Sequence, residues 1–565
     1  MMLSTRLRYA LLAGLLLFIA VATLNPDPYG NNPNIIGDES YFLTSSLNAI
    51  EKVTLPGWEF SASGNYYGGV QTYIDTVVLV PVIGVMLAAN HFSLLDTKIQ
   101  IALHTGDLLA VLRFVNGFLF VAFCGFFLFY FARRKVPSPL GQSLLFLLFL
   151  LLGNSLIIGF VHTAKVWMLY MVLDAAVGVL FVTQEYYLSR GLEPFVKKNV
   201  YIALMVWIAT AAFFQNYVGV FPILLWILYA ILLKHIQLRE VWNYVLRYWY
   251  LFAISFALNI SFLYRAAFVK GHAVWWDPGV VAVMTPSDGI DWFRRLYNPI
   301  AYAVGSQPLV LLYIIGLMTA LFFWRKADHR KRFYLAIACL HPVFIYLIFH
   351  ALLGFGLFPR YSLPLTIAVS FAIIMLLGEI RKLRIAGLVV SGALACIVMT
   401  HAIGLYWKPS SESILTSTLA TEYNSPHDVF IFEPVWPQAS RLSLPFNSTS
   451  LSLLNTRQQN MSRYQFLLQH LDTVDQFVPF KSTVVLPDSA SEKSAYLSHF
   501  PASTYAAWTI SSDCKSLCSE AEMRAGTCFE VNVPACDVYP QDIHMLGDFL
   551  SYTQLGSAYI VRRAE

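Results

Sequence analysis

Long apolar runs recur along the 565-residue chain and constrain its fold more than any other feature. A run of roughly 17 to 25 mostly apolar residues is long enough to cross a bilayer as a helix. Eleven such runs lie at about residues 7–24, 108–131, 140–160, 166–188, 199–215, 217–233, 243–263, 300–323, 333–352, 362–379 and 385–406. They predict an α-helical polytopic membrane protein with about 11 transmembrane helices.

The scarcity of charge agrees with this prediction. Charged residues make up 13% of the chain and the set AVILMFWYC 57%, whereas about 25% of residues are charged in an average soluble domain. A net charge of +5 over this length is too small to indicate nucleic-acid binding. The composition therefore excludes an ordinary soluble enzyme and predicts membrane lipids, not nucleic acid, as partners.

Clusters of Lys and Arg occupy alternate short loops, and such loops face the cytoplasm. The clusters are Arg6 with Arg8, Arg133–Lys135, Lys197–Lys198, Lys234 with Arg239, Arg325–Arg332 and Arg381–Arg384. They predict a cytoplasmic N-terminus. The membrane is expected to be a bacterial inner (plasma) membrane. The apolar stretch Ile74–Asn90, which contains Pro81 and Gly84, is predicted to be re-entrant or interfacial. If this stretch crossed the membrane, every later basic loop would move to the side opposite the cytoplasm.

This topology divides the chain into two domains. Residues 1–406 form the predicted transmembrane domain, whose outer loop 25–107 carries the interfacial and re-entrant helices. Residues 407–565 form a soluble domain outside the cytoplasm, which is the periplasm in a bacterium. An α/β fold is indicated there by strand-like runs at Val429–Phe432, Thr483–Leu486 and Ala558–Val561.

Four cysteines cluster in the second domain, namely Cys514, Cys518, Cys528 and Cys536. A compartment outside the cytoplasm is oxidising, so we expect two disulfides, for which three connectivities exist. The alternative is a structural zinc site, but the paired C-x2-C spacing that is typical of one is missing.

An acidic pair in the first outer loop is the main catalytic candidate. Asp38 and Glu39 precede a helical pattern of Leu43, Leu47 and Ile50, which predicts a short amphipathic helix along the membrane surface. Asp38 at the start of a helix stays ionised and can accept a proton. The alternative role for Asp38 is to cap the helix. No metal site is predicted, although the pair can hold a divalent cation loosely.

Cations and aromatic residues occur at the predicted outer ends of several spans. Arg360 has a planar fork that suits phosphate, and Lys165 with His162 lies near the outer end of the fourth predicted span. Snorkelling of these cations to lipid headgroups is the alternative. Asp174 should face the bundle interior, where an interhelical hydrogen bond is the simplest role. The rings of Tyr66 and Tyr67 can stack on a sugar or lie in the interfacial belt, and the loop with Trp275 and Trp276 can cover a site or dock the tail. These four residues and Tyr361 are the substrate-binding candidates.

Five motifs, taken in order, resemble the GT-C superfamily of membrane glycosyltransferases. The resemblance is to the branch that contains the lipid A aminoarabinose transferases and the protein O-mannosyltransferases in particular. GDESY at 37–41 resembles the acidic motif of that branch's first outer loop and places Asp38 at its catalytic carboxylate. The other motifs are NYYGGVQTY at 65–73, AVLRFVNGFLFV at 110–121, QNYVG at 215–219 and PRYSLPL at 359–365. QNYVG resembles the family motif K-Y-x-G, but Gln215 stands in the position of the Lys.

The resemblance implies a fold and an activity over roughly residues 7–400. It implies an inverting glycosyltransferase that moves a sugar from a polyprenyl-phosphate donor to a hydroxyl of a protein, lipid or glycan on the outer face. Asp38 would accept the hydroxyl proton, with Glu39 in support, and the cations would bind the donor phosphate. The alternatives are a transporter or flippase of lipid-linked sugars and a ligase of the O-antigen type.

Overall fold

The structure is a computed structural model, and it describes most of the transmembrane part of the chain and segments of the C-terminal tail. The described residues are 5–24, 36–58, 69–133, 137–162, 166–215, 220–268, 309–325, 327–348, 363–378, 380–407, 425–426, 429–431, 447–454, 459, 462–478, 481–485, 490–499, 504–509, 528–530 and 557–562.

Each of the eleven predicted apolar runs forms helix in its described part. Five described helices are long and apolar enough to cross a membrane, or seven if each of two sharply bent helix pairs is one span. This is the architecture of an α-helical membrane protein, and crossing by all eleven runs stays a prediction. The described helices of the eleven runs are α1 (Thr5–Thr23), α5 (Thr105–Arg133), α6 (Ser138–Leu152), α7 (Ser155–Val161), α8 (Val166–Leu188), α9 (Lys198–Gln215), α10 (Val220–Leu232), α11 (Leu238–Arg247), α12 (Trp249–Phe268), α15 (Leu309–Trp324), α16 (His329–Tyr346), α17 (Leu363–Leu377) and α18 (Arg381–Tyr406). One of the five helices that are long enough to cross, Gly69–Ala89, lies outside these runs.

The two bends divide predicted single runs into two helices each. Helices α6 and α7 meet at 73°, and α11 and α12 meet at 71°. At the first bend, Asn154 caps α7 because its Oδ1 accepts hydrogen bonds from the backbone N–H groups of Leu156 and Ile157. A cap of this kind satisfies donors that the broken helix would otherwise leave unpaired.

The centre of the bundle is α17, in which all 15 residues are buried. It packs against α15, α16, α8 and α6. Gly178 of α8 lies against the ring of Phe371 of α17, so a larger side chain at 178 would clash with that ring. A helix that is apolar on every side is typical of such a central position.

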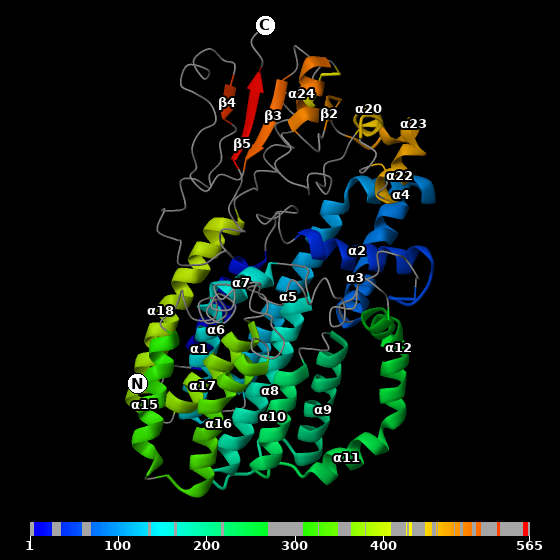
Figure 1. Ribbon diagram of the computed structural model, residues 1–565. Coiled ribbons are helices and arrows are strands. Elements are labelled where there is room, and N and C mark those ends of the chain that lie inside the picture. The colour runs from blue at the N-terminus through cyan, green and yellow to red at the C-terminus, as the bar shows by residue number, and fades with distance from the viewer. Residues whose placement is uncertain are drawn as a thin grey trace, which may run out of the picture.

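The ends of the bundle differ in charge. The basic end is the one where α8 and α10 end and α9 and α16 begin, and it includes α11 and the turn between α15 and α16 (Figure 1). Arg190, Lys198, Lys234 and Arg330 belong to these helix ends or to the turns beside them. The opposite end, here called the tail end, lies toward the C-terminal strands. The described basic loops therefore gather at one end, as their alternation predicts. The compartment that each end faces stays a prediction.

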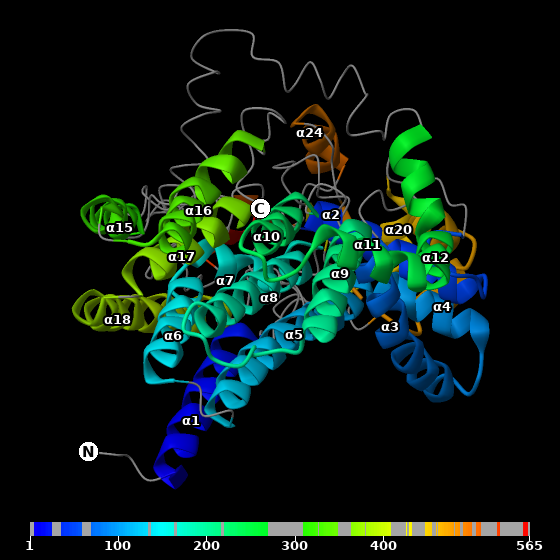
Figure 2. The same ribbon diagram turned by 90° about the horizontal axis from the view of Figure 1, so that it is seen from below.

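Three helices of the predicted outer loop lie at the tail end. These are α2 (Ile36–Glu51), α3 (Gly69–Ala89) and α4 (Leu94–Leu103). Helix α3 continues through Pro81 and is by itself long enough to span a membrane. Its first turn contacts the tail-end part of α9, whereas α4, which follows it, contacts a tail helix (Figures 1 and 2). Both ends of α3 thus lie toward the tail, and α3 does not carry the chain to the basic end.

The described tail contains short helices and strands. Strands β1 (Val429–Ile431) and β2 (Thr483–Val485) pair in parallel, whereas β3 (Thr504–Thr509), β5 (Ser557–Arg562) and β4 (Cys528–Glu530) form an antiparallel sheet in that order. The three predicted strands are therefore present. The helices are α20 (Ser448–Ser452), α22 (Ser462–Leu468), α23 (Leu471–Val474) and α24 (Ala490–His499).

The predicted disulfides lie outside what the structure describes. Of the four clustered cysteines, only Cys528 belongs to a described element, and its side chain is not described. Among the described cysteines, Cys124, Cys339 and Cys396 are free thiols in α5, α16 and α18. Two disulfides in the tail stay a prediction.

Candidate functional site

The acidic pair lies at the start of helix α2. Asp38 and Glu39 are the third and fourth residues of this helix, which confirms the predicted helix, and their side chains are outside the described ones. The apolar stripe of α2 is not spread over a membrane surface. Leu43 is buried against Leu79 of α3 and Leu112 of α5. The protein itself therefore fixes the helix that carries the two acids.

A buried polar group beneath α2 joins α3 to the bundle. We call it the tail-end amide cluster, and it consists of Gln71, Asp75, Asn116 and Gln215, each with no solvent exposure. The backbone N–H of Gln71 donates to Oε1 of Gln215 at 2.8 Å. The side-chain amide of Gln71 donates to Oδ1 of Asp75 at 2.8 Å and to Oδ1 of Asn116 at 3.1 Å. Three helices, α3, α5 and α9, are thus held in register.

Helix α2 is fastened to the same region through α3. The Ser46 hydroxyl donates to the backbone carbonyl of Thr72 at 3.3 Å, and both residues are fully buried. Hydrogen bonds between buried polar groups are costly to break, because each group would lose its partner without gaining water. The position of α2 relative to α5 and α9 therefore depends on the tail-end amide cluster.

His162 ties the end of α7 to the end of α1. Its Nε2 lies 3.0 Å from the backbone carbonyl of Ala22, and the residue is 7% exposed. A carbonyl only accepts hydrogen bonds, so Nε2 carries the proton and donates it to Ala22. This nitrogen is therefore engaged within the protein. Binding of a phosphate through Nδ1 would require an imidazolium, with both ring nitrogens protonated.

Most of the other predicted site residues lie outside the described residues. These are the donor-binding candidates Arg360 and Lys165 and the aromatic candidates Tyr66, Tyr67, Tyr361, Trp275 and Trp276. Their roles stay predictions. Lys165 belongs to the segment that joins α7 to α8. The end of α7 and the start of α8 lie at the same end of the bundle as α2.

Asp174 faces the bundle interior, as predicted. It is 1% exposed, and Nε1 of Trp226 on α10 donates to its Oδ1 at 3.2 Å. The Trp226 ring packs against the imidazole of His341 on α16, with ring centroids 4.3 Å apart. His341 Nδ1 lies 3.4 Å from the hydroxyl of Tyr229. The predicted interhelical hydrogen bond of Asp174 is therefore confirmed.

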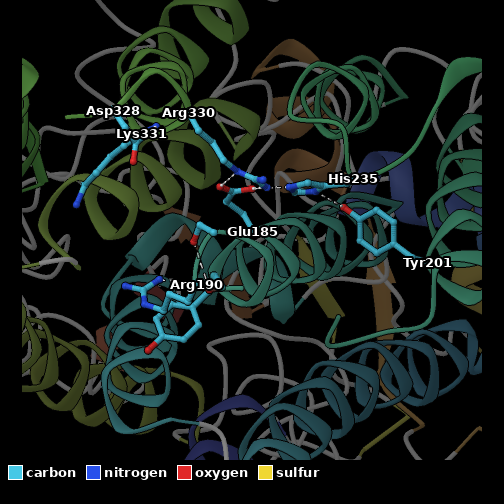
Figure 3. Close-up of polar contacts among 9 residues, drawn as sticks. Glu185, Arg190, Tyr201, His235, Asp328, Arg330 and Lys331 are labelled. Carbon is cyan, nitrogen blue, oxygen red and sulfur yellow. Dashed lines mark hydrogen bonds and ion pairs between the residues drawn. The ribbon is translucent and has the colours of Figure 1, made fainter. Parts of the chain in front are cut away.

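An ionic group at the basic end was not predicted from the sequence. We call it the basic-end ionic cluster, and it consists of Glu185, Tyr201, His235 and Arg330 (Figure 3). Arg330 binds the Glu185 carboxylate through two nitrogens, at 2.9 Å and 2.7 Å. His235 Nε2 lies 2.6 Å from Oε2 of Glu185, and its Nδ1 lies 3.5 Å from the hydroxyl of Tyr201.

The basic-end ionic cluster joins four segments that are distant in sequence. Glu185 comes from the end of α8, Tyr201 from α9, His235 from the turn after α10, and Arg330 from the first turn of α16. A bidentate arginine with a carboxylate is the strongest side-chain ion pair. The signal available in the sequence was Glu185 itself, a carboxylate in the last turn of an apolar run, where an unpaired charge would be costly.

The described side chains do not form a metal site. Among the described residues, no group of three or more His, Cys, Asp or Glu is placed to hold a metal ion. A divalent cation at Asp38 and Glu39 stays a prediction, because their side chains lie outside the described ones.

Comparison with known proteins adds no further information on this site. No family model, no curated protein and no solved structure matches the chain. The functional argument therefore depends on the chemistry of the residues and on the geometry of the tail end.

Proposed function

We propose that the protein transfers a sugar from a polyprenyl-phosphate donor to a hydroxyl group of an acceptor at the outer face of the membrane. The observation that carries the proposal is the placement of Asp38 and Glu39 in the first turn of α2. This helix is packed on α3 and α5 above a buried amide network. The helix that carries the two acids is therefore fixed by protein contacts, which supports a role as proton acceptor.

In the proposed reaction, the acceptor oxygen attacks the anomeric carbon of the sugar. Asp38 accepts the hydroxyl proton as the new bond to carbon forms, and Glu39 supports Asp38. The bond between the anomeric carbon and the phosphate oxygen breaks with its electron pair remaining on the phosphate, and the configuration at carbon inverts. No general acid is needed, because a phosphate is a stable leaving group.

The proposed donor matches the location of the acids. A polyprenyl chain stays in the lipid, so its sugar-phosphate lies at the interface. In this scheme Arg360 and Lys165 stabilise the charge on the departing phosphate, as the resemblance implies. His162 would add to this only as an imidazolium, with Nδ1 protonated as well as Nε2. Fixed cations at such a position stabilise the transition state by several kcal/mol in other enzymes. The sugar, and whether the acceptor is protein, lipid or glycan, are left open by this proposal.

The test is transfer by the purified protein from a panel of labelled polyprenyl-phosphate sugars to membrane and secreted fractions. We expect Asp38→Ala to reduce the rate at least about 100-fold, since a positioned general base contributes that much or more. The matched control is Asp96→Ala, which removes an acid from the first turn of the neighbouring helix α4. Full activity of Asp38→Ala, or equal losses in the two variants, would contradict the assignment.

A second candidate function is movement of the lipid-linked sugar across the membrane. One observation favours it, namely the buried carboxyl group of Asp174 on α8, which accepts a hydrogen bond from Trp226, whose ring packs on His341. Buried ionisable residues of this kind mark ion pathways in transporters. Reconstituted vesicles separate the two functions. Movement of the donor to the opposite leaflet without transfer, lost in Asp174→Asn, would favour transport.

A further inference from the structure

Helix α11 lies across the basic end of the bundle, crosswise to α9 and α12 (Figure 1). It meets α12 at 71°, and together the two helices are long and apolar enough to form one broken membrane span. Helix α12 runs from this bend toward the tail end (Figure 1). The bend therefore places α11 where the span ends, which is the level of the lipid headgroups.

One side of α11 is held by the protein. Tyr244 and Val245 pack against the apolar core of the bundle. Nε1 of Trp207 on α9 donates a hydrogen bond to the Tyr244 hydroxyl at 3.0 Å. Glu240 forms an ion pair with Lys198 in the first turn of α9. These contacts fix the rotation of α11 about its own axis, so the sides that face away from the bundle are fixed as well.

The rest of α11 is exposed as two stripes, each with one residue at every fourth position. The apolar stripe, whose residues are 52–67% exposed, consists of Leu238, Trp242 and Leu246. The polar stripe, which is also exposed, consists of Arg239, Asn243 and Arg247. Successive residues lie about 100° apart around a helix, so the two stripes adjoin along the whole length of α11.

Lipid is the partner that fits the apolar stripe. A row of large apolar side chains is an unfavourable surface in water, and Trp249 at the start of α12 adds a second tryptophan that is 65% exposed. Tryptophan is enriched where a membrane meets water, and helices with Leu and Trp on one side and Arg on another lie in that interface. Helix α12 exposes Ile254 and Phe256, as a membrane span does, so hydrocarbon adjoins α11.

The charge beside the apolar stripe identifies the headgroup. Lys234, Arg239 and Arg247 are exposed, and among the described residues none of the three forms an ion pair. Glu240 is the one acid of α11, and Lys198 already neutralises it. The exposed charge is therefore positive. A guanidinium offers two parallel N–H groups to a phosphate, so the complementary lipid is an anionic phospholipid.

We propose that α11 is an interfacial helix that binds anionic phospholipids at the basic end of the bundle. The apolar stripe would insert among the upper parts of the acyl chains, and Arg239 and Arg247 would bind the lipid phosphates. This surface lies at the end of the bundle opposite the acids of α2, and the proposal does not depend on glycosyl transfer.

Photolabelling of the purified full-length protein in nanodiscs tests the proposal. The discs contain equal parts of phosphatidylglycerol and phosphatidylcholine, and a trace of either lipid carries a diazirine near the carboxyl end of one acyl chain. Mass spectrometry locates the labels. We expect both probes to label residues 238–249, the phosphatidylglycerol probe at least about tenfold more strongly, since two basic residues face the lipid.

Helix α15 provides the internal reference. Its Ile314 and Met318 are exposed on a helix without charged residues, so the two probes should label them equally. Labelling of α15 without labelling of residues 238–249 would overturn the proposal, because α11 would then face solvent or another protein. Equal labelling of α11 by the two probes would overturn the binding of anionic headgroups.

Variants separate a site on α11 from attraction to the whole basic end. Arg239→Gln should lower the phosphatidylglycerol preference roughly fivefold, which corresponds to about 1 kcal/mol for one basic residue at an anionic surface. The matched control is Arg325→Gln, an exposed cation beside α15 that should leave the preference unchanged. Equal losses in the two variants would overturn the site.

The apolar stripe is tested by Trp242→Gln. This variant should lower labelling of residues 238–249 by both probes alike, because it removes an apolar side chain and no charge. An unchanged yield would contradict insertion of the stripe. If any variant does not fold, the comparison of the two probes in the unchanged protein decides.

Discussion

The tail-end amide cluster and the basic-end ionic cluster both bury polar groups, but they are built from different chemistry. At the basic end, the Glu185 carboxylate receives Arg330 and His235 at distances of 2.6–2.9 Å. At the tail end, Gln71 is the centre, and its partners are two amides and one carboxylate. A cationic partner offsets part of the free-energy cost of burying a carboxylate. A network of hydrogen-bonded amides instead fixes the orientation of the side chains and helices that it joins.

This difference assigns the two clusters different roles. The basic-end ionic cluster joins α8, the turn after α10 and α16, far from the acids of α2. The tail-end amide cluster sets the position of α3, and through it that of α2. We therefore expect changes at the basic end to alter stability alone, and changes at the tail end to alter both stability and activity.

The largest effect on stability is expected for Glu185→Ala. The change leaves the buried His235, and Arg330 at 40% side-chain exposure, without their carboxylate. Removal of one member of a fully buried ion pair costs about 3–5 kcal/mol, and the exposure of Arg330 places the expected loss at or below the lower end of that range. Thermal unfolding in detergent, compared with the parent protein, measures the loss. Glu185→Gln should lose less, because the amide oxygen still accepts a hydrogen bond. A loss below about 1 kcal/mol in Glu185→Ala would show that the cluster contributes little.

An intermediate effect on stability is expected for Gln215→Leu. The side chain keeps a similar volume, but the buried N–H of Gln71 loses its acceptor, which costs about 1–3 kcal/mol. Because α3 and α2 are then less well positioned, transfer activity should fall further than the loss of folded protein explains. Activity per folded molecule, measured at a temperature where both proteins are folded, checks this.

A glutamine at the opposite end provides the matched control. Gln184 is 3% exposed, and its Oε1 accepts a hydrogen bond from the backbone N–H of Val196 at 3.1 Å. Gln184→Leu should lower stability by a similar amount and leave activity per folded molecule unchanged. If both glutamine variants lose activity equally, the proposed difference between the two ends of the bundle is wrong.

The smallest effect is expected for Glu240→Gln. Glu240 forms an ion pair with Lys198 between α11 and α9, and both side chains are partly exposed to solvent. Exposed pairs contribute about 0–1 kcal/mol. The same unfolding assay should show a shift close to its error, in contrast to Glu185→Ala. A loss as large as that of Glu185→Ala would mean that burial is not what distinguishes the two carboxylates.

Several elements could be predicted because their signal is local. Each long apolar run forms helix, and the strand-like runs near Val429, Thr483 and Ala558 are strands. The bends between α6 and α7 and between α11 and α12 were not predicted, because the apolar runs continue across them. At Gly153 the chain turns after the last residue of α6, and the cap by Asn154 becomes favourable only once α7 has another direction.

The placement of α2 shows where local signals are insufficient. The pattern of Leu43, Leu47 and Ile50 predicts one apolar stripe, and the stripe exists. Hydropathy alone does not distinguish a stripe that lies on lipid from one that packs on protein. The structure provides α3 and α5 as the partners of that stripe, so α2 is held by protein contacts.

The sequence by itself determined the helical membrane architecture, the gathering of basic loops at one end and the placement of an acidic pair at the start of a helix. These features depend on the length of apolar runs and on the order of charges, both of which are local properties. Only the tertiary structure decided that Glu185 meets His235 and Arg330, that Gln71 meets Gln215, and that α11 lies across the basic end of the bundle. Such contacts depend on the rotation and tilt of each helix, which are set by packing among segments distant in the chain.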